Sequence, residues 1–138
     1  MNTRFFTVTT FTLCVFGAPL AIAEEMQPGQ YASVNVVEMA NGEMKTFQER
    51  QCITAKDIAD GLTKVGIEND GACNAQNLVK ANGKITYRLV CEADGKKQLA
   101  DVVGTYTANS YEFSIKAASP GPEHKSISLT GRRIGACP

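Results

Sequence analysis

Four cysteines constrain the fold of this chain more than any other feature: Cys52, Cys73, Cys91 and Cys137. The gaps between them are 21, 18 and 46 residues, whereas structural zinc sites usually bring their cysteines in close pairs such as C-x2-C. In an oxidising compartment, an even number of widely spaced cysteines predicts two disulfides, with three possible connectivities. Each bridge typically adds about 2–4 kcal/mol to the stability of a small domain.

Residues 1–23 predict the oxidising compartment. Arg4 supplies a positive charge, an apolar and threonine-rich stretch runs from Phe5 to about Leu20, and Ala21-Ile22-Ala23 forms a small-x-small cleavage site. The threonines, with a glycine and a proline, interrupt the stretch too often for a membrane-spanning helix. We therefore expect a cleavable signal peptide that carries the fifth cysteine away. Residues 24–138 are expected to form one periplasmic domain that keeps no stable membrane anchor.

The charge balance of the remaining chain excludes one class of partner. Cleavage removes one of 14 basic residues, which leaves 13 against 14 acidic residues. A general nucleic-acid binder, or a protein that binds anionic membranes, depends on an excess of lysine and arginine. We therefore expect neither a nucleic acid nor an anionic membrane surface as the partner.

Short segments with alternating apolar and polar residues dominate the chain after residue 23. Turn signals separate them, such as Asn41-Gly42, Asn82-Gly83 and Asp94-Gly95. The clearest alternation lies in segments 85–91, 110–117 and 126–130, and weaker strand candidates lie near 30–38, 44–51, 73–80 and 98–107. The pattern predicts a mainly β (α+β) fold, in which about six to seven strands form an antiparallel meander or half-barrel with one buried face.

One docked α-helix is predicted near residues 54–65. Thr54 can act as its N-cap, and Asp57 three residues later completes a capping-box-like start. Gly66 is placed to end the helix, while Gly61 inside it costs about 1 kcal/mol relative to alanine. The apolar stripe expected to face the sheet consists of Ile58, Leu62 and Val65.

The hairpin around Asn82-Gly83 indicates how the cysteines pair. A two-residue turn would place Cys73 and Cys91 out of register, whereas a three-residue loop over residues 81–83 places them directly opposite each other. We therefore predict the three-residue loop and a Cys73–Cys91 disulfide across the hairpin. By elimination, Cys52–Cys137 would join the start of the helix to the C-terminal strand.

Several of these residues form a spaced series. It consists of Pro28-Gly29-Gln30-Tyr31, Gln51-Cys52-Ile53-Thr54 followed by Asp57-Ile58, the hairpin cysteines, and the ending Gly131-Arg132-Arg133-Ile134-Gly135-Ala136-Cys137-Pro138. The series resembles the domain of unknown function 3617 family, small exported proteins of Gram-negative bacteria, over nearly all of the chain after residue 23. The resemblance implies a periplasmic location and no assigned biochemical activity.

The chain also departs from that family pattern. Tyr31 stands where the family commonly has tryptophan, and Ala55 where it often has proline. Many members carry a methionine-rich segment between the first strands, of which only Met39 and Met44 remain here. If that segment provides a soft apolar surface for a partner, this chain has largely lost it.

Three residues are possible contacts with a ligand or partner: Arg132, Arg133 and Tyr31. On a strand the two arginines point to opposite faces, so at most one can enter a cavity. Such an arginine could recognise an anionic ligand or an acidic partner, or it could form a structural ion pair or a charged sheet edge. Tyr31 could line a cup inside a curved sheet or belong to the core, together with Tyr87, Tyr106, Tyr111 and Phe113.

The sequence contains no recognisable catalytic constellation, cofactor fingerprint or metal motif. We therefore expect no catalytic, cofactor-binding or metal-binding residues, and a monomeric, non-catalytic binding or envelope-interaction module whose partner is a small ligand or an envelope protein. One alternative is a small hydrolase that uses His124, the single histidine, or a carboxylate pair. Another is an inhibitor of an envelope enzyme, with the loop over residues 119–123 as its contact.

Overall fold

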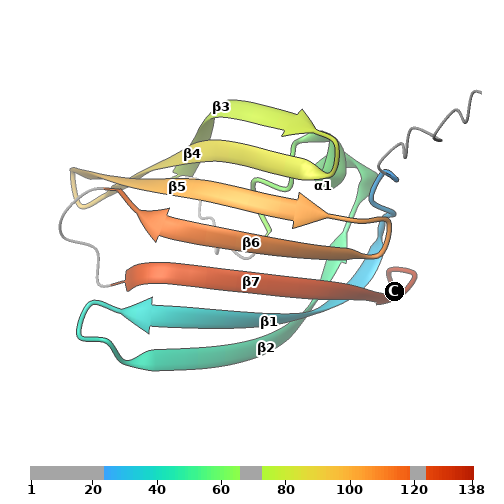
Figure 1. Ribbon diagram of the computed structural model, residues 1–138, viewed down its shortest axis with the longest axis horizontal. Helices are drawn as coiled ribbons and strands as arrows, with labels where there is room; N and C mark the ends of the chain where they lie inside the picture. Colours follow the sequence, from blue (N-terminus) through green and yellow to red (C-terminus); the bar gives the residue numbers. More distant parts are fainter. Residues whose placement is uncertain (1–23, 66–72, 119–123) are drawn as a thin grey trace, which may run out of the picture.

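The computed structural model describes residues 24–65, 73–118 and 124–138, so the predicted signal peptide lies outside the described residues. Within these ranges, seven antiparallel strands form one open sheet, and a single short helix, α1 (Ala55–Ala59), packs behind it (Figure 1). The strands are β1 (Gly29–Met39), β2 (Met44–Ile53), β3 (Cys73–Ala81), β4 (Lys84–Ala93), β5 (Lys96–Tyr106), β6 (Ser110–Ala117) and β7 (His124–Gly135). The prediction of a mainly β fold with about six to seven strands is confirmed.

The strand order in the sheet is β2-β1-β7-β6-β5-β4-β3. Strands β3 to β7 follow one another as a meander, and the β1–β2 hairpin is added beside β7. The first and last strands are therefore neighbours, which a simple meander would not produce. Strands β2 and β3 form the two edges of the sheet (Figure 1).

The core lies on the face of the sheet that α1 covers, which we call the inner face; the opposite, outer face is turned to the viewer in Figure 1. Alternate residues of the strands point inward, and α1 with the turn after it closes over them at the end of the sheet where β1 begins and β7 ends. The buried core consists of Met26, Tyr31, Ile53, Ile58, Leu62, Val65, Ile85, Tyr87, Leu89, Val102, Tyr111, Phe113, Ile115 and Leu129.

Helix α1 is shorter than predicted. Its start is as expected, because the Thr54 hydroxyl accepts a hydrogen bond from the Asp57 backbone N–H at 3.2 Å and the Asp57 carboxylate accepts one from the Thr54 N–H at 2.8 Å. The helix then ends at Ala59, since Gly61 and Leu62 adopt left-handed conformations with φ of 76° and 58°. All three residues of the predicted stripe are buried, but a turn rather than a helix carries Leu62 and Val65.

The predicted three-residue hairpin loop is wrong. Asn82 and Gly83 form a two-residue turn, both with positive φ, and Ala81 pairs with Lys84. The register shifts by one residue between Gln76 and Val79, where a β-bulge adds an extra residue to β3. Asn77 takes φ of 56° there, a conformation that asparagine tolerates better than most residues. The bulge thus supplies the residue that the sequence analysis assigned to the loop.

The structure contains the two disulfides expected from the sequence. Cys73 and Cys91 lie directly opposite each other in the β3–β4 register, with their Cα atoms 4.0 Å apart. Cys52, on β2, is joined to Cys137, just after β7, with Cα atoms 5.4 Å apart and a sequence separation of 85. The second bridge therefore ties the edge hairpin to the C-terminal end of the chain.

Two glycines on the inner face make room for aromatic rings on β6. Gly104 pairs with Phe113 and Gly131 pairs with Tyr111, and a Cβ atom at either glycine would overlap the opposite ring. The ring of Tyr111 packs against Phe113 and Tyr31, with centroid distances of 5.7 and 5.8 Å. A row of rings thus crosses β6, β7 and β1 because β5 and β7 carry no side chain at these points.

Burial of Tyr87 predicts a loss of stability in alkaline solution. Its side chain is 5% exposed, and burial raises the pKa of the hydroxyl from 10.0 to about 12. The neutral hydroxyl is favoured in the folded state. The stabilisation that this pKa difference gives the folded state is therefore complete below pH 10 and is lost as the pH rises toward 12. We expect Tyr87→Phe to remove up to about 2.7 kcal/mol of that pH dependence. Urea unfolding of both proteins from pH 7 to pH 12 measures it; equal slopes would contradict the prediction.

Candidate functional site

Arg133 has a structural role at the start of β1. Its Nε atom donates a hydrogen bond to the Pro28 carbonyl at 3.1 Å, and its backbone N–H donates to the Asn109 carbonyl at 2.9 Å. A Cβ atom at Gly29 would overlap both the Arg133 guanidinium and the Gly135 carbonyl, so the glycine allows this close approach. Arg133 therefore fixes the chain that enters β1 to the end of β7.

Arg132 points to the outer face, where it lines an open groove of about 490 Å³. The groove crosses β1, β7, β6 and the end of β5, and its volume lies within the usual range for small-molecule sites. Six of its eleven lining residues are small or carry a hydroxyl on a short side chain: Ala32, Val34, Thr105, Thr107, Ser110 and Thr130. Of the groove residues, only Arg132 was predicted from the sequence, because small polar residues on an exposed strand face carry no distinctive pattern.

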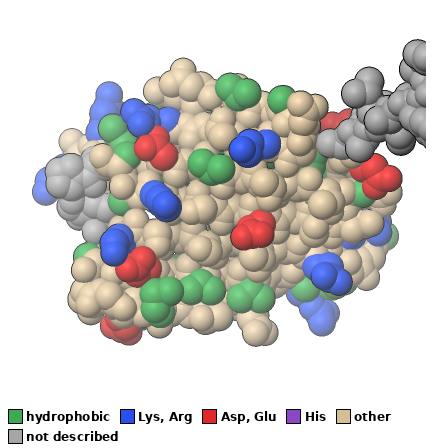
Figure 2. Space-filling model, in the orientation of Figure 1, with side chains coloured by type: hydrophobic (Ala, Val, Ile, Leu, Met, Phe, Trp, Pro, Cys, Tyr) green, Lys and Arg blue, Asp and Glu red, His purple; other side chains and the backbone are tan. Residues whose placement is uncertain are grey.

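Glu112 provides the opposite charge in the same groove. Arg132 pairs with Ser110 and Glu112 pairs with Thr130, so the two charged residues are diagonal neighbours on β7 and β6. Among the described residues, neither charged group forms a hydrogen bond or an ion pair with another side chain. Figure 2 shows this face: uncharged atoms cover most of it, and the charged side chains are scattered rather than clustered. Within the part of the chain that the structure describes, the groove therefore offers one free cation, one free anion and several hydroxyl groups.

Tyr31 belongs to the core. Its side chain is 0% exposed, and its hydroxyl donates a hydrogen bond to the Gln27 carbonyl at 2.7 Å. Burial raises the pKa of this hydroxyl, and the neighbouring Arg133 partly offsets that rise. A ligand on either face of the sheet therefore has no access to Tyr31 in this structure.

The inner face of the β1–β2 hairpin carries a polar row that the sequence analysis missed. Ser33 is 2% exposed, and its hydroxyl donates a hydrogen bond to the Glu49 carbonyl at 3.4 Å, beside the Tyr111 ring that reaches across Gly131. The side-chain oxygens of Asn35 and Gln51 are buried and have no hydrogen-bond partner among the described residues. Such atoms require a donor from water or a ligand. The available signal was the polar inward side of β1 and β2, where the other strands are apolar.

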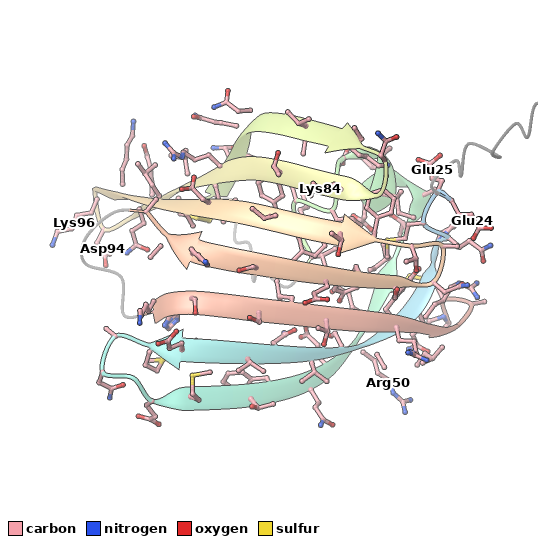
Figure 3. The ribbon with its side chains drawn as sticks, viewed as in Figure 1. Glu24, Glu25, Arg50, Lys84, Asp94 and Lys96 are labelled. Carbon is pink, nitrogen blue, oxygen red and sulfur yellow. A yellow bond between two sulfur atoms is a disulfide. The ribbon has the colours of Figure 1, made fainter. Side chains whose placement is uncertain are left out.

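The groups considered for catalysis are not assembled into a site within the described residues. His124 is exposed at the first position of β7, and no hydrogen bond or ion pair joins it to another described side chain. No group of three or more His, Cys, Asp or Glu residues in these ranges could hold a metal ion. Several carboxylates lie far apart, such as Glu24, Glu25 and Asp94 at opposite ends of the sheet (Figure 3). The loop over residues 119–123, proposed as an inhibitor contact, lies outside the described residues.

Comparison with known proteins places the chain in a family without a known activity. Within the described ranges, no helix has the length and apolar character needed to cross a membrane. No curated protein and no solved structure matches the chain significantly. The family model described as protein of unknown function (DUF3617) matches residues 26–137. Because the match covers the whole sheet, both disulfides and α1, the chain belongs to the DUF3617 family.

Proposed function

We propose that this protein is a non-catalytic binding module of the bacterial periplasm, and that the groove around Arg132 takes a small zwitterionic ligand such as an amino acid or a short peptide. The observation that carries this proposal is that one groove holds a guanidinium and a carboxylate, neither of which has a side-chain partner among the described residues. A ligand carboxylate would bind the fork of Arg132, since two parallel N–H donors suit its geometry. The ligand ammonium would lie toward Glu112.

The rest of the groove suits the polar backbone of such a ligand. Hydroxyl groups both donate and accept hydrogen bonds, so Thr105, Ser110 and Thr130 can pair with amide or carboxylate atoms in either orientation. Ala32 and Val34, which is 37% exposed, offer apolar contact for a small side chain. The groove is open, so we expect modest affinity and selectivity for short ligands.

Binding should depend on Arg132 more than on any other charged residue of the outer face. A charge-assisted hydrogen bond contributes about 1.5–3 kcal/mol, so Arg132→Gln should weaken binding of a dipeptide such as dialanine by about tenfold or more. Glu112→Gln should weaken the same ligand but spare its N-acetylated form, which carries no ammonium group. Titration of the ¹⁵N-labelled protein, followed by amide chemical shifts, measures both effects and locates the site.

Arg88→Gln is the matched control, because Arg88 lies on the outer face outside the groove and is already bound to Asp101 at 2.8 Å. It should leave binding unchanged. Shifts confined to the inner face near Asn35 and Gln51 would move the site to the polar row and refute the groove. An absence of shifts with every amino acid and dipeptide would leave only surface contacts with an envelope protein as the function.

The proposed location rests on two features. Residues 1–23 have the pattern of a secretory signal, and two disulfides of wide sequence separation are typical of proteins that fold in an oxidising compartment. Fractionation of cells that express the full chain tests this location. The protein should be released by osmotic shock, with Glu24 as its first residue; recovery in the cytoplasm with reduced cysteines would contradict the proposal.

A further inference from the structure

The two edges of the sheet are built differently. Edge strand β3 is interrupted by the bulge at Asn77, a feature that hinders pairing with another strand. Edge strand β2 pairs with β1 over ten consecutive residues without a register shift, and no other described strand lies beside it. Its residues 44–50 are all exposed, including Met44 at 59% and Phe47 at 53%. A regular strand with a free edge and exposed apolar side chains is a site for pairing with a further strand.

We propose that β2 pairs antiparallel with β2 of a second copy of this chain, so that two sheets join into one across a two-fold axis at Phe47. In the exposed segment 44–50 of β2, the inner-face residues are Lys45, Phe47 and Glu49, opposite Val37, Asn35 and Ser33 of β1. With the axis at Phe47, the two phenyl rings face each other. Lys45 of each copy then lies opposite Glu49 of the other.

Charge selects this register over the alternatives. Antiparallel pairing of two identical strands places residues of the same face opposite each other, so the axis must coincide with one residue of β2. An axis at Lys45, Glu49 or Arg50 would bring two like charges together, which is unfavourable. An axis at Thr46 or Gln48 would set a charged side chain against Phe47. Only the axis at Phe47 joins apolar to apolar and cation to anion on the inner face.

The structure leaves these groups able to take part. Glu49 accepts a hydrogen bond from Asn35 at 3.0 Å through one carboxylate oxygen, Oε1, so Oε2 is left for a lysine of the second copy. Lys45 lies 3.9 Å from Glu43, an exposed and weak pairing that it can exchange. The paired segment would run from Met44 to Arg50 and stop before the disulfide at Cys52. Figure 3 shows the Arg50 side chain extending past β2, away from β1, at the end of this segment.

Charge-reversal variants test the proposal in the protein produced from the full chain, with both disulfides formed. Sedimentation equilibrium should show a concentration-dependent dimer of the unaltered protein. Lys45→Glu and Glu49→Lys should each raise the dimer dissociation constant by about tenfold or more, because each creates two repulsive cross-strand contacts. The double variant Lys45→Glu with Glu49→Lys should restore it to about the original value. Lys96→Glu, a charge reversal at the turn between β4 and β5 (Figure 3), should have no effect.

A cross-link locates the axis independently. Under mild oxidation, Phe47→Cys should form a covalent dimer, whereas Gln48→Cys, one residue away on the outer face, should not. Circular dichroism checks that each variant folds. From the sequence we expected a monomer, and sedimentation as a monomer at every concentration would uphold that expectation and overturn the proposal. The proposal would also be overturned if the single reversals had no effect or if the double variant stayed dissociated. Cross-linking only through Gln48→Cys, or capture of a different protein at β2 without self-association, would overturn it as well.

Discussion

Replacing Gly131 with valine should lower the free energy of unfolding by about 3 kcal/mol, because the added atoms would overlap the Tyr111 ring in a packed core. Tyr111 is 3% exposed and contacts both Phe113 and Tyr31, so its ring cannot move without disturbing two further core residues. Urea unfolding followed by circular dichroism measures the change.

Two further variants separate this overlap from a general effect of glycine replacement. Gly135→Ala, four residues further along β7, should be nearly neutral, since a Cβ atom there meets no atom within 4 Å. In a Tyr111→Ala background, Gly131→Val should cost much less than it does alone, because the ring that it would meet is absent. Equal costs in both backgrounds would show that the cross-strand packing of Gly131 and Tyr111 is not the cause.

Removing the Cys52–Cys137 disulfide should lower the free energy of unfolding more than the Gly131 substitution does. The bridge closes a span of 85 residues, and the loss of loop-closure entropy predicts about 4.6 kcal/mol for a span of that length. The double variant Cys52→Ser with Cys137→Ser should therefore unfold at a much lower urea concentration than the intact protein. In the same variant, the C-terminal residues after β7 should exchange their amide protons faster.

The Cys73–Cys91 disulfide provides the comparison. Cys73–Cys91 closes a span of only 18 residues, for which the same relation predicts about 3.2 kcal/mol. The variant Cys73→Ser with Cys91→Ser should thus retain more stability than the variant without Cys52–Cys137. The opposite order would mean that the bulged β3 edge depends on its bridge more than the β1–β2 hairpin depends on the C-terminal end.

The sequence predicted the strands well because each of them has a local signal. Segments such as 110–117 alternate between apolar and polar residues, and asparagine–glycine or aspartate–glycine pairs mark several turns. The helix was predicted too long because the period of Ile58, Leu62 and Val65 fits a helix, while the backbone turns at Gly61. Burial requires only that these side chains point toward the sheet, so Leu62 and Val65 are buried although the helix has ended before them.

The remaining features depend on contacts between distant segments. The bulge at Asn77 lies next to Leu78, whose side chain packs close to Gly61 in the turn after α1. No local sequence pattern predicts this contact. The groove combines β1 with β5, β6 and β7, so its residues cannot be grouped before the strand order is known. For the same reason, Arg132 was identified from the sequence and its neighbour Glu112 was not.

The position of β1 between β2 and β7 has a consequence for how the chain reaches this structure. A chain exported from its N-terminus, as proposed above, delivers β1 first and β7 last, so β1 lacks one neighbour until almost the whole chain has crossed. Cys52 likewise waits for Cys137, while Cys73 is available much earlier. Until export ends, the β1–β2 hairpin is open to wrong partners. A chaperone that holds the chain and an isomerase that corrects early disulfides would therefore raise the yield of native protein.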